Sequence, residues 1–457
     1  MPRKKKHSSI YQISRRSFMK SMAALGGAAT LPNIITSCAS SRITRRVAAN
    51  ERITMGIIGF GWQGYNNTNH FIHLDDVQVV AVCDVDQEHL EAGQDFVNGY
   101  YNNKDCATYR NFEEIVARDD IVAMMIALPD HWHALPVIAC ANAGIHVYGE
   151  KPLSHTLVEG RAMVDAIEKN GLIWQTGSWQ RSVANFHHCA ELVRNGFIGK
   201  VHTIECGLTS GHNDYNETGH LKAFTDPPPH LDYVRWLGPS GSPEKLPYAP
   251  ARTHKNWRWI MAHGGGALMD WVGHHVDIAH WGVDLDESGP VKVKGTGVFP
   301  PKDNLWDAPT RYDCFATYEN GLVIHMNSDF PGGTKWIGEE GWIFVTRGDI
   351  KESNIQGIFE EDRSSLPVKL YKNDDHFQNF IDSIRSGKES ITPCETAHRS
   401  ASVGHLCNIA MYTGRTIKWD PQTETIVDDP EATKMLSPIY HGEWKLNQER
   451  QGWYRFL

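Results

Sequence analysis

A glycine-rich segment and a later carboxylate carry the pattern that binds a dinucleotide. The segment is Gly59-Phe60-Gly61-Trp62-Gln63-Gly64, and Asp84 follows it about 20 residues on. The first glycine permits a tight turn, the second lets the backbone approach a pyrophosphate, and the third lets a helix meet a strand. Asp84 can accept hydrogen bonds from an adenosine ribose and would repel a 2′-phosphate, and no arginine lies near the loop in the chain. The pattern predicts NAD as the cofactor, in preference to NADP.

The elements around this loop are those of a doubly wound parallel sheet. Apolar runs of strand length lie at 53–58, 77–83, 121–128 and 145–148, with helical stretches between them. Ligands of such sheets bind beyond the carboxyl ends of the strands. We therefore expect the residues that follow the strands to face one crevice and to contact the cofactor: Pro129, Asp130, His131, His133, Glu150 and Lys151.

The pattern changes from about residue 177. We expect an α/β protein with an N-terminal Rossmann dinucleotide-binding domain at 51–176. A C-terminal α/β domain at 177–457, with an open, largely antiparallel sheet, would bind the substrate and form oligomers. The strands of that domain are predicted at 291–299, 312–318, 322–330 and 342–346, and its helices at 375–386 and 395–413.

The first 50 residues are predicted to be a signal peptide and a linker. Ser14-Arg15-Arg16-Ser17-Phe18-Met19-Lys20 precedes a stretch of small apolar residues, which is the pattern of a twin-arginine export signal. Ile35-Thr36-Ser37-Cys38 resembles a lipoprotein cleavage box, so lipidation of Cys38 and ordinary cleavage nearby stand as equal alternatives. We expect the twin-arginine machinery to export the protein to the periplasm, with or without a lipid anchor.

The composition narrows the classes of ligand. The chain has 457 residues, long enough for two or three domains, and its net charge of −9 comes from 45 basic and 54 acidic residues. The most basic stretch lies in the first 46 residues, outside any folded domain, so nucleic acid is not an expected partner. Fifteen Trp and fifteen Tyr suit a hydroxyl-rich ligand, because aromatic faces pack on the C–H faces of sugars. The candidate sugar contacts are Trp179, Gln180, Arg181, Trp257 and Arg258, although each Trp could equally serve core packing or an oligomer interface.

Two groups of histidines have spacings that could hold a metal. His274, Asp277 and His280 recur at helical spacings, and His131 and His133 form an H-x-H pair. No H-E-x-x-H motif or cysteine cluster accompanies them. We therefore expect no metal.

The tetrapeptide Gly149-Glu150-Lys151-Pro152, behind a glycine loop, resembles the signature of the Gfo/Idh/MocA oxidoreductase family. In that family the lysine of E-K-P and a later D-x-x-x-H pair line the reacting carbon. The resemblance thus implies Lys151, Asp270 and His274 as catalytic residues, with the adjacent His275 as an alternative base. Val272 stands where relatives usually carry glycine, so the local turn is expected to differ. Further matching motifs are Pro129–His133, Gly177–Ser182, Gly264–Asp270 and His274–Trp281.

The chemistry agrees with these roles. Oxidation of a secondary alcohol needs a base for the hydroxyl proton as hydride leaves carbon, and imidazole titrates near neutrality. Lys151 can hold and polarise the same oxygen, and Asp270, one helical turn before His274, can orient or charge-balance it.

The resemblance also implies a sugar or glycoside substrate and a homo-oligomer. Little free NAD exists outside the cytoplasm, so export favours a tightly bound cofactor and a redox-neutral cycle. Such a cycle would be either transient oxidation that cleaves a glycoside or transfer of hydride between two sugars. The alternatives are a net NAD(P)-dependent sugar or polyol dehydrogenase and a non-catalytic sugar-binding protein that keeps the fold.

Overall fold

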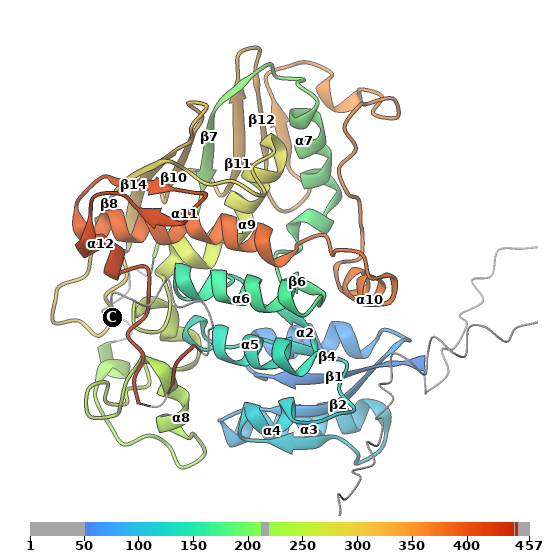
Figure 1. The fold of residues 1–457 in the computed structure, drawn as a ribbon, viewed down its shortest axis with the longest axis vertical. Helices are drawn as coiled ribbons and strands as arrows, with labels where there is room; N and C mark the ends of the chain where they lie inside the picture. Colours follow the sequence, from blue (N-terminus) through green and yellow to red (C-terminus); the bar gives the residue numbers. More distant parts are fainter. Residues whose placement is uncertain (1–50, 212–218, 443, 447–457) are drawn as a thin grey trace, which may run out of the picture. The chain divides into compact units, whose positions relative to one another are not determined.

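The computed structural model describes residues 51–211, 219–442 and 444–446, and these residues form two β-sheets with helices packed against them (Figure 1). The predicted signal peptide, with Cys38, lies outside the described residues. Within the described part of the chain, no helix combines the length and the apolar character that crossing a membrane requires.

The first sheet is parallel and has six strands in the order β3-β2-β1-β4-β5-β6. The order reverses between β1 and β4, and a crevice opens at such a switch point beyond the carboxyl ends of the strands. The strands are β1 (Ile53–Ile58), β2 (Val77–Cys83), β3 (Ala107–Tyr109), β4 (Ala123–Ile126), β5 (His146–Gly149) and β6 (Trp174–Thr176). The helices between them are α2 (Trp62–Ile72), α3 (Gln87–Tyr101), α4 (Phe112–Val116), the 3₁₀ turn η2 (Asp130–Trp132), α5 (Ala134–Ala143) and α6 (Leu157–Lys169).

The second sheet has nine strands in the order β13-β12-β11-β7-β10-β9-β8-β14-β15. Among these described strands β7 and β10 pair in parallel and the other neighbours are antiparallel, which confirms the predicted largely antiparallel sheet. The strands are β7 (Val201–Gly207), β8 (Lys292–Val298), β9 (Arg311–Thr317), β10 (Val323–Asn327), β11 (Gly333–Gly338), β12 (Trp342–Val345), β13 (Lys351–Ser353), β14 (Ile417–Asp420) and β15 (Thr425–Ile426).

Two long helices connect this sheet to the rest of the molecule. They are α9 (Gly266–Val283) and α11 (Cys394–Thr413); α9 packs on β11 and β7, while α11 packs on α9, β8 and α6 (Figure 1). Most residues of both helices are buried, which is expected for helices covered on more than one side. The remaining helices and 3₁₀ turns are η3 (Trp179–Ser182), α7 (Ala184–Arg194), η4 (Gly219–Lys222), α8 (Tyr233–Leu237), η5 (Gly238–Ser240), η6 (His254–Trp259), η7 (Ile358–Glu360), α10 (His376–Ser386) and α12 (Pro430–Lys434).

The helix α10 returns late in the chain to the first sheet. Its fully buried Phe380 belongs to the same hydrophobic core as Ile57 and Phe71, and its ring lies 6.0 Å from that of Phe71. The core of the first sheet is therefore completed by residues about 300 positions away in the sequence, and the two predicted parts of the chain share packing.

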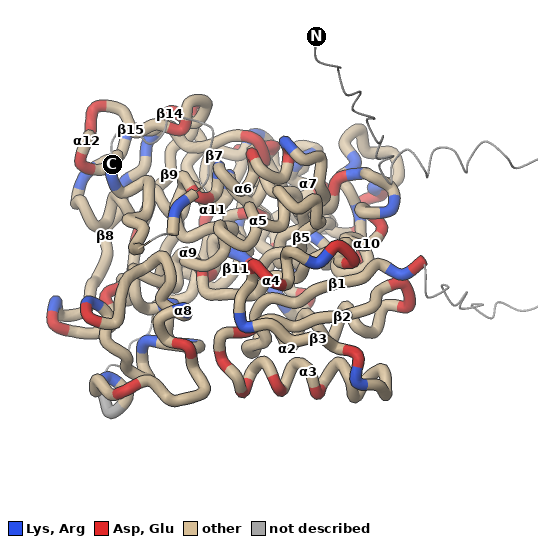
Figure 2. Tube along the Cα trace, turned by 60° about the horizontal axis from the view of Figure 1, so that its bottom comes forward, with Lys and Arg blue, Asp and Glu red and all other residues tan. Residues whose placement is uncertain are grey.

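Charge is unevenly placed along α3. The acidic residues Glu88, Glu91 and Asp95 follow one another on this helix, which carries no Lys or Arg (Figure 2). The negative charge of these side chains favours cations beside this helix.

Candidate functional site

One cavity of about 830 Å³ extends from the glycine loop to α9. Its volume falls in the range of sites that enclose a cofactor or a small ligand. The walls come from the carboxyl ends of β1, β2, β4 and β5 on one side and from η6, α9 and the segment after β12 on the other.

The glycine loop forms the floor of the cavity at one end. Gly59 has φ +90°, and a Cβ there would lie 2.3 Å from the carbonyl oxygen of Ala127, so only glycine makes this turn without strain. A Cβ at Gly64 would lie 2.0 Å from the Gly59 carbonyl oxygen, which shows how closely α2 meets β1. At Gly61 the nearest atom would be 4.0 Å away, on His89, so this position is open to the cavity.

The start of α2 is available to an anion. Gly61 precedes the helix and supplies no side-chain cap, so the described residues leave the first helical N–H groups free of side-chain acceptors. These N–H groups and the helix dipole favour a phosphate. The loop therefore fits a dinucleotide pyrophosphate.

Asp84 is held rigidly at the cavity wall. Its Oδ2 accepts the N–H of Phe60 at 2.8 Å, and its Oδ1 accepts the N–H of Asp86 at 2.9 Å. Two arginines that are distant in sequence, Arg110 and Arg235, also line this end. No arginine lies near the loop in the sequence, but the fold brings these two arginines close to it. Arg110 donates to the carbonyl oxygen of Val85 at 2.8 Å.

At the other end of the cavity a lysine and a carboxylate form an ion pair. Lys151 Nζ donates to Asp270 Oδ1 at 2.6 Å and to the Asp270 carbonyl oxygen at 3.1 Å. Arg258 Nε lies 3.4 Å from the same Oδ1. Burial raises the pKa of Asp270, but the ammonium of Lys151 and the guanidinium of Arg258 outweigh burial and hold the pKa below its ordinary value. Asp270 is thus a carboxylate at neutral pH.

His274 lines the cavity one helical turn after Asp270. Burial lowers its pKa well below the ordinary value, and the charges of Lys151 and Arg347 lower it further, so the ring is neutral. Its Nδ1 is buried, with no hydrogen-bond partner among the described residues. The site therefore holds a neutral imidazole beside an ammonium.

His275 takes a different direction from the same helix. Its ring stacks on Trp271, with centroids 5.6 Å apart, and it does not line the cavity. The helix α9 is continuous through Val272, so Asp270 and His274 lie on one uninterrupted helix. At Gly273 the helix α9 comes close to Lys151, since a Cβ at this position would lie 3.1 Å from the Cβ of Lys151.

The polar side chains of the turn η2 are buried in the core. The sequence had instead predicted that they face the crevice. His131 lies near the carbonyl oxygens of Trp236 and His263, and burial lowers its pKa to about 3. His133 bonds the carbonyl oxygens of Leu128 and Pro152. Neither ring lines the cavity, because a buried imidazole must satisfy its nitrogens within the protein.

Asp130, in the same turn, is also buried. Burial raises its pKa well above the ordinary value, and the nearby charge of Asp270 raises it further. Its carboxyl lies behind Gly264, whose Cβ would come within 3.3 Å of it. The cavity wall at this point is formed by Pro129.

The other predicted cofactor and sugar contacts also divide into residues that line the cavity and residues that are buried elsewhere. Arg181 is buried and pairs with Asp277 and Asp286, each at 2.8 Å, so it serves the core. Gln180 donates to the carbonyl oxygen of His274 at 3.2 Å and does not reach the cavity. Phe60 packs on the rings of Tyr65 and Phe96. The predicted residues that line the cavity are Gly59, Gly61, Trp62, Gln63, Gly64, Asp84, Pro129, Glu150, Lys151, Trp179, Trp257, Arg258, Asp270 and His274.

The fold adds an arginine that no motif in the sequence indicates. Arg347 follows β12, and its guanidinium carbon lies 4.7 Å from the ring centroid of Trp179 and 4.8 Å from that of Trp271. Its Nε donates to Oε1 of Gln180 at 2.9 Å. Two indoles and the guanidinium that lies over both of them therefore line the same cavity as His274, and aromatic rings are groups on which sugars pack.

The histidines considered for a metal in the sequence have other partners. His280 Nε2 lies 2.5 Å from the hydroxyl of Tyr318, and Asp277 pairs with Arg181. Among the described residues, the groups that could hold an ion lie elsewhere and share Asp86.

The site and the fold together define a class of protein. A parallel sheet with a glycine loop at its switch point, facing a lysine, a carboxylate and an imidazole across one cavity, is the arrangement of a dinucleotide-dependent oxidoreductase. Residues 53–178 match the family described as "Oxidoreductase family, NAD-binding Rossmann fold", and residues 183–446 match "Oxidoreductase family, C-terminal alpha/beta domain". The chain belongs to the Gfo/Idh/MocA oxidoreductase family, as the sequence predicted. Residues 12–32 match the twin-arginine translocation signal, which confirms the predicted export route.

Individual relatives differ in how much of the chain they match. The myo-inositol 2-dehydrogenase of Thermotoga maritima is 30% identical over 380 residues, covering 80% of this chain and 98% of that protein. A glycosyl hydrolase family 109 protein of Shewanella pealeana is 27% identical over 207 residues, covering 42% of this chain. That match spans only 44% of the hydrolase, less than half of its length.

Solved structures share the fold. The aldose-aldose oxidoreductase of Caulobacter crescentus, complexed with glycerol, matches with a TM-score of 0.56 at 19% identity, covering 80% of this chain and 99% of that one. The WlbA dehydrogenase of Bordetella pertussis, in complex with NADH and UDP-GlcNAcA, matches with a TM-score of 0.58 at 19% identity, covering 81% of this chain and 99% of that one. At these identities the likeness is one of fold.

Proposed function

We propose that this oxidoreductase transfers a hydride at a ring hydroxyl of a sugar or glycoside, with NAD as a tightly bound cofactor. The observation that carries the proposal is the Lys151–Asp270 pair beside the neutral His274, which faces the glycine loop across one cavity. The names of the relatives, an inositol dehydrogenase and an aldose-aldose oxidoreductase, support a polyhydroxylated substrate.

The residues divide the work of the reaction. When bound, the nicotinamide supplies the hydride acceptor and, on return, the donor. His274 accepts the hydroxyl proton, because its ring is neutral and lines the cavity. Lys151 donates a hydrogen bond to the same oxygen and stabilises the charge that develops on it, while Asp270 holds the ammonium in place. Trp179, Trp271 and Arg347, which line the cavity with His274, contact the sugar ring.

Asp84 supports NAD over NADP. Its carboxylate is fixed by two backbone N–H groups and points its charge at the place where a 2′-phosphate would lie. Arg110 and Arg235 lie at the same end, but one donates to a carbonyl oxygen and the other pairs with Glu113. We therefore expect NAD to bind more tightly than NADP, and calorimetric titration of both cofactors tests this.

A redox-neutral cycle requires that the cofactor leave the site slowly, and a segment docked beside the cofactor end of the cavity supports this. The segment that contains His230 docks on the loop after β2: the Gln87 N–H donates to the His230 carbonyl oxygen at 2.9 Å, and the Asp232 N–H donates to the Val85 carbonyl oxygen at 3.1 Å. A cofactor retained in this way must be regenerated on the enzyme. The twin-arginine route fits this, because cofactor loaded inside the cell can leave with the protein.

The remaining proposals concern the mature protein. We propose that it acts in the periplasm as a homo-oligomer, with residues 51–176 as the cofactor domain and residues 177–457 as the substrate and oligomerisation domain. Cys38 is the proposed lipidation site. Mass spectrometry of the processed protein distinguishes a lipidated Cys38 from ordinary cleavage, and light scattering gives the subunit number.

The decisive experiment counts turnovers without added cofactor. The processed protein, purified from exporting cells, is incubated with a panel of glycosides and free sugars, and product per enzyme is measured. Many turnovers without NADH accumulation support the redox-neutral cycle. A single equivalent that added NAD extends indicates a net dehydrogenase instead, and sugar binding without product in either condition indicates a binding protein.

A further inference from the structure

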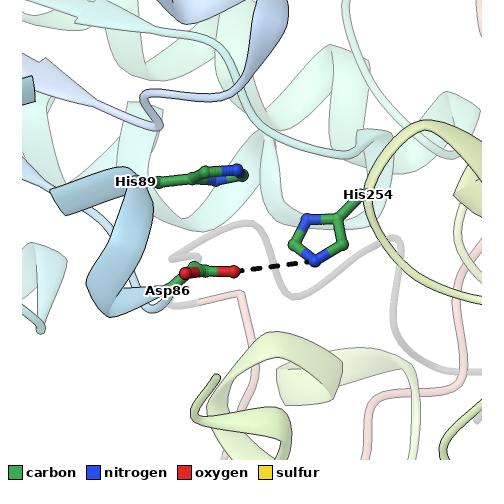
Figure 3. A group of neighbouring side chains, drawn as sticks. All are labelled: Asp86, His89 and His254. Carbon is green, nitrogen blue, oxygen red and sulfur yellow. Dashed lines mark ion pairs between the residues drawn. The ribbon is translucent and has the colours of Figure 1, made fainter. Parts of the chain in front are cut away.

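A group of metal-ligating side chains lies at the cofactor end of the cavity, away from Lys151 and His274. Asp86 is the residue before α3, and His89 lies in the first turn of that helix, three positions after Asp86. This spacing brings both side chains to one face of the start of the helix. His254 comes from the beginning of η6, in the other half of the chain. Figure 3 shows the three side chains converging, with the His254 ring facing the Asp86 carboxylate.

Asp86 is a buried carboxylate whose second oxygen lacks a hydrogen bond. Its side chain is only 3% exposed, and Oδ1 accepts the N–H of Glu88 at 2.9 Å. Oδ2 lies 3.6 Å from His254 Nε2 and 3.8 Å from His230 Nε2, and no described residue hydrogen-bonds to it. A buried carboxylate is costly unless a cation satisfies it, so Oδ2 is aimed at a place that a cation would occupy.

The distances fit an ion after small side-chain movements. One ligand atom each from Asp86, His89 and His254 lies within 4.8 Å of the others. Metal–ligand bonds of about 2.0–2.2 Å place ligands of a tetrahedral zinc ion roughly 3.5 Å apart, close to the present Asp86–His254 separation. The two histidine side chains are 36% and 40% exposed and line the cavity, so an ion can reach them and they can turn.

The surroundings also favour a cation. Asp84 Oδ2 lies 3.7 Å from His89 Nδ1, and Glu88 Oε1 lies 3.4 Å from His230 Nδ1, so two further carboxylates flank the group. His254 presents its ring to Asp86 from the beginning of η6, where its backbone has φ +50°.

We propose that Asp86, His89 and His254 bind one divalent transition-metal ion of the zinc type, with water or His230 completing the coordination. Two imidazoles and one carboxylate form the ligand set that such ions prefer. The ion would join the start of α3 to the beginning of η6 across the cofactor end of the cavity. This departs from the sequence expectation of no metal, which considered different histidines.

Metal binding is measured directly, without reference to turnover. The processed protein is dialysed against a chelator, and Zn²⁺ is then titrated by calorimetry, with metal content after desalting measured by mass spectrometry. We expect one Zn²⁺ per chain. Failure to retain Zn²⁺ overturns the proposal, whatever the enzyme's activity.

Conservative variants separate this site from adventitious binding. Asp86→Asn keeps an oxygen that can cap α3 but removes the charge, and His254→Asn keeps a residue that tolerates the left-handed backbone but removes the imidazole. Each should weaken Zn²⁺ binding at least tenfold, as should His89→Gln. The exposed His202 lies outside the group, and His202→Gln should retain it. Equal Zn²⁺ affinity in His254→Asn and His202→Gln contradicts the proposal.

Discussion

Lys151 Nζ lies 2.6 Å from Asp270 Oδ1, although the two residues are 119 positions apart in the chain. The lysine follows β5 of the parallel sheet and the carboxylate lies in α9, so the pair joins the two halves of the molecule at the cavity. Arg258 approaches the same oxygen at 3.4 Å. One carboxylate between two cations keeps the ammonium in a fixed position, and fixed donors are what a developing oxyanion requires.

Removing the ammonium should abolish most turnover and spare binding. In Lys151→Ala, kcat should fall about 10²- to 10⁴-fold, the range for loss of a group that assists proton transfer, while NAD affinity should change little. The measurement is product formation on the sugar panel, with NAD titrated in parallel. Lys292, an exposed lysine on β8, provides the control variant Lys292→Ala. Unchanged turnover in Lys151→Ala would rule out this assignment of the site.

The acid limit of activity should depend on Arg347. Burial lowers the pKa of His274 well below its ordinary value, and the charges of Lys151 and Arg347 lower it further. The ring therefore stays neutral, and able to accept a proton, below pH 6.5. Arg347→Met removes one positive charge, which raises the pKa of His274 and moves the acidic limb of kcat/KM to higher pH. The readout is the position of the limb, because the loss of the indole contacts also weakens substrate binding. The control variant Lys294→Met, on the second sheet, should leave the acidic limb of kcat/KM unchanged. An unchanged acidic limb in Arg347→Met would count against His274 as the base.

The turn at Gly59 should tolerate no side chain. Gly59→Ala combines a left-handed backbone with a Cβ 2.3 Å from the Ala127 carbonyl oxygen, whereas Gly144→Ala has the same backbone strain and nothing within 4 Å. We expect Gly144→Ala to cost about 1 kcal/mol of stability, and Gly59→Ala to cost several kcal/mol and at least tenfold in NAD affinity. Thermal unfolding and calorimetry measure both. Similar melting temperatures in the two variants would show that the close contact is relieved without cost.

Buried neutral histidines should make the protein less stable in acid. Burial lowers the pKa of His376 to about 4 and that of His405 to about 3. The unfolded chain binds these protons near pH 6.5, so their contribution to stability is complete above pH 6.5 and is lost as the pH falls toward the folded values. Glu159, whose pKa burial raises to about 7, opposes this trend in part.

A single variant tests the sign. In His405→Gln, the pH dependence of unfolding free energy between pH 6.5 and 4 should flatten by about 1.4 kcal/mol per pH unit. The melting temperature of each protein is measured across that range. A steeper dependence in the variant would mean that His405 is protonated in the folded protein.

Local features of the sequence predicted the cofactor end of the site. The glycine loop needs a positive φ at Gly59 and close packing at Gly64, and both requirements act over a few residues. Asp84 and Lys151 follow buried strands. The carboxyl ends of parallel strands lie at the same edge of a sheet, whatever the positions of the connecting helices, so both residues were expected at that edge. The strands predicted at 291–299, 312–318, 322–330 and 342–346 correspond to β8, β9, β10 and β12, whereas β7 and β11 were not predicted. In β11, glycines stand at both ends and a lysine lies in the middle, so its burial depends on the neighbouring strands.

Tertiary packing decided which side chains reach the cavity. His274 and His275 are adjacent in the sequence, and the packing of α9 on α11 and β11 decides that only His274 of the two lines the cavity. His131 and Arg181 looked available from their motifs, but their turns face the core, where each finds buried partners. Arg347 gave no local sign of a role, since its place depends on the packing of the second sheet beside η3.

The sequence by itself therefore determined the export signal, the family, the order of the two sheets and the residues that follow the parallel strands, because these depend on neighbours along the chain. Only the tertiary structure decided that His274 lines the cavity, that Arg347 lies over Trp179 and that Asp86 meets His254, because these positions depend on the packing of elements far apart in the chain. Contacts of that range are set by the packing of whole elements, which no local pattern records.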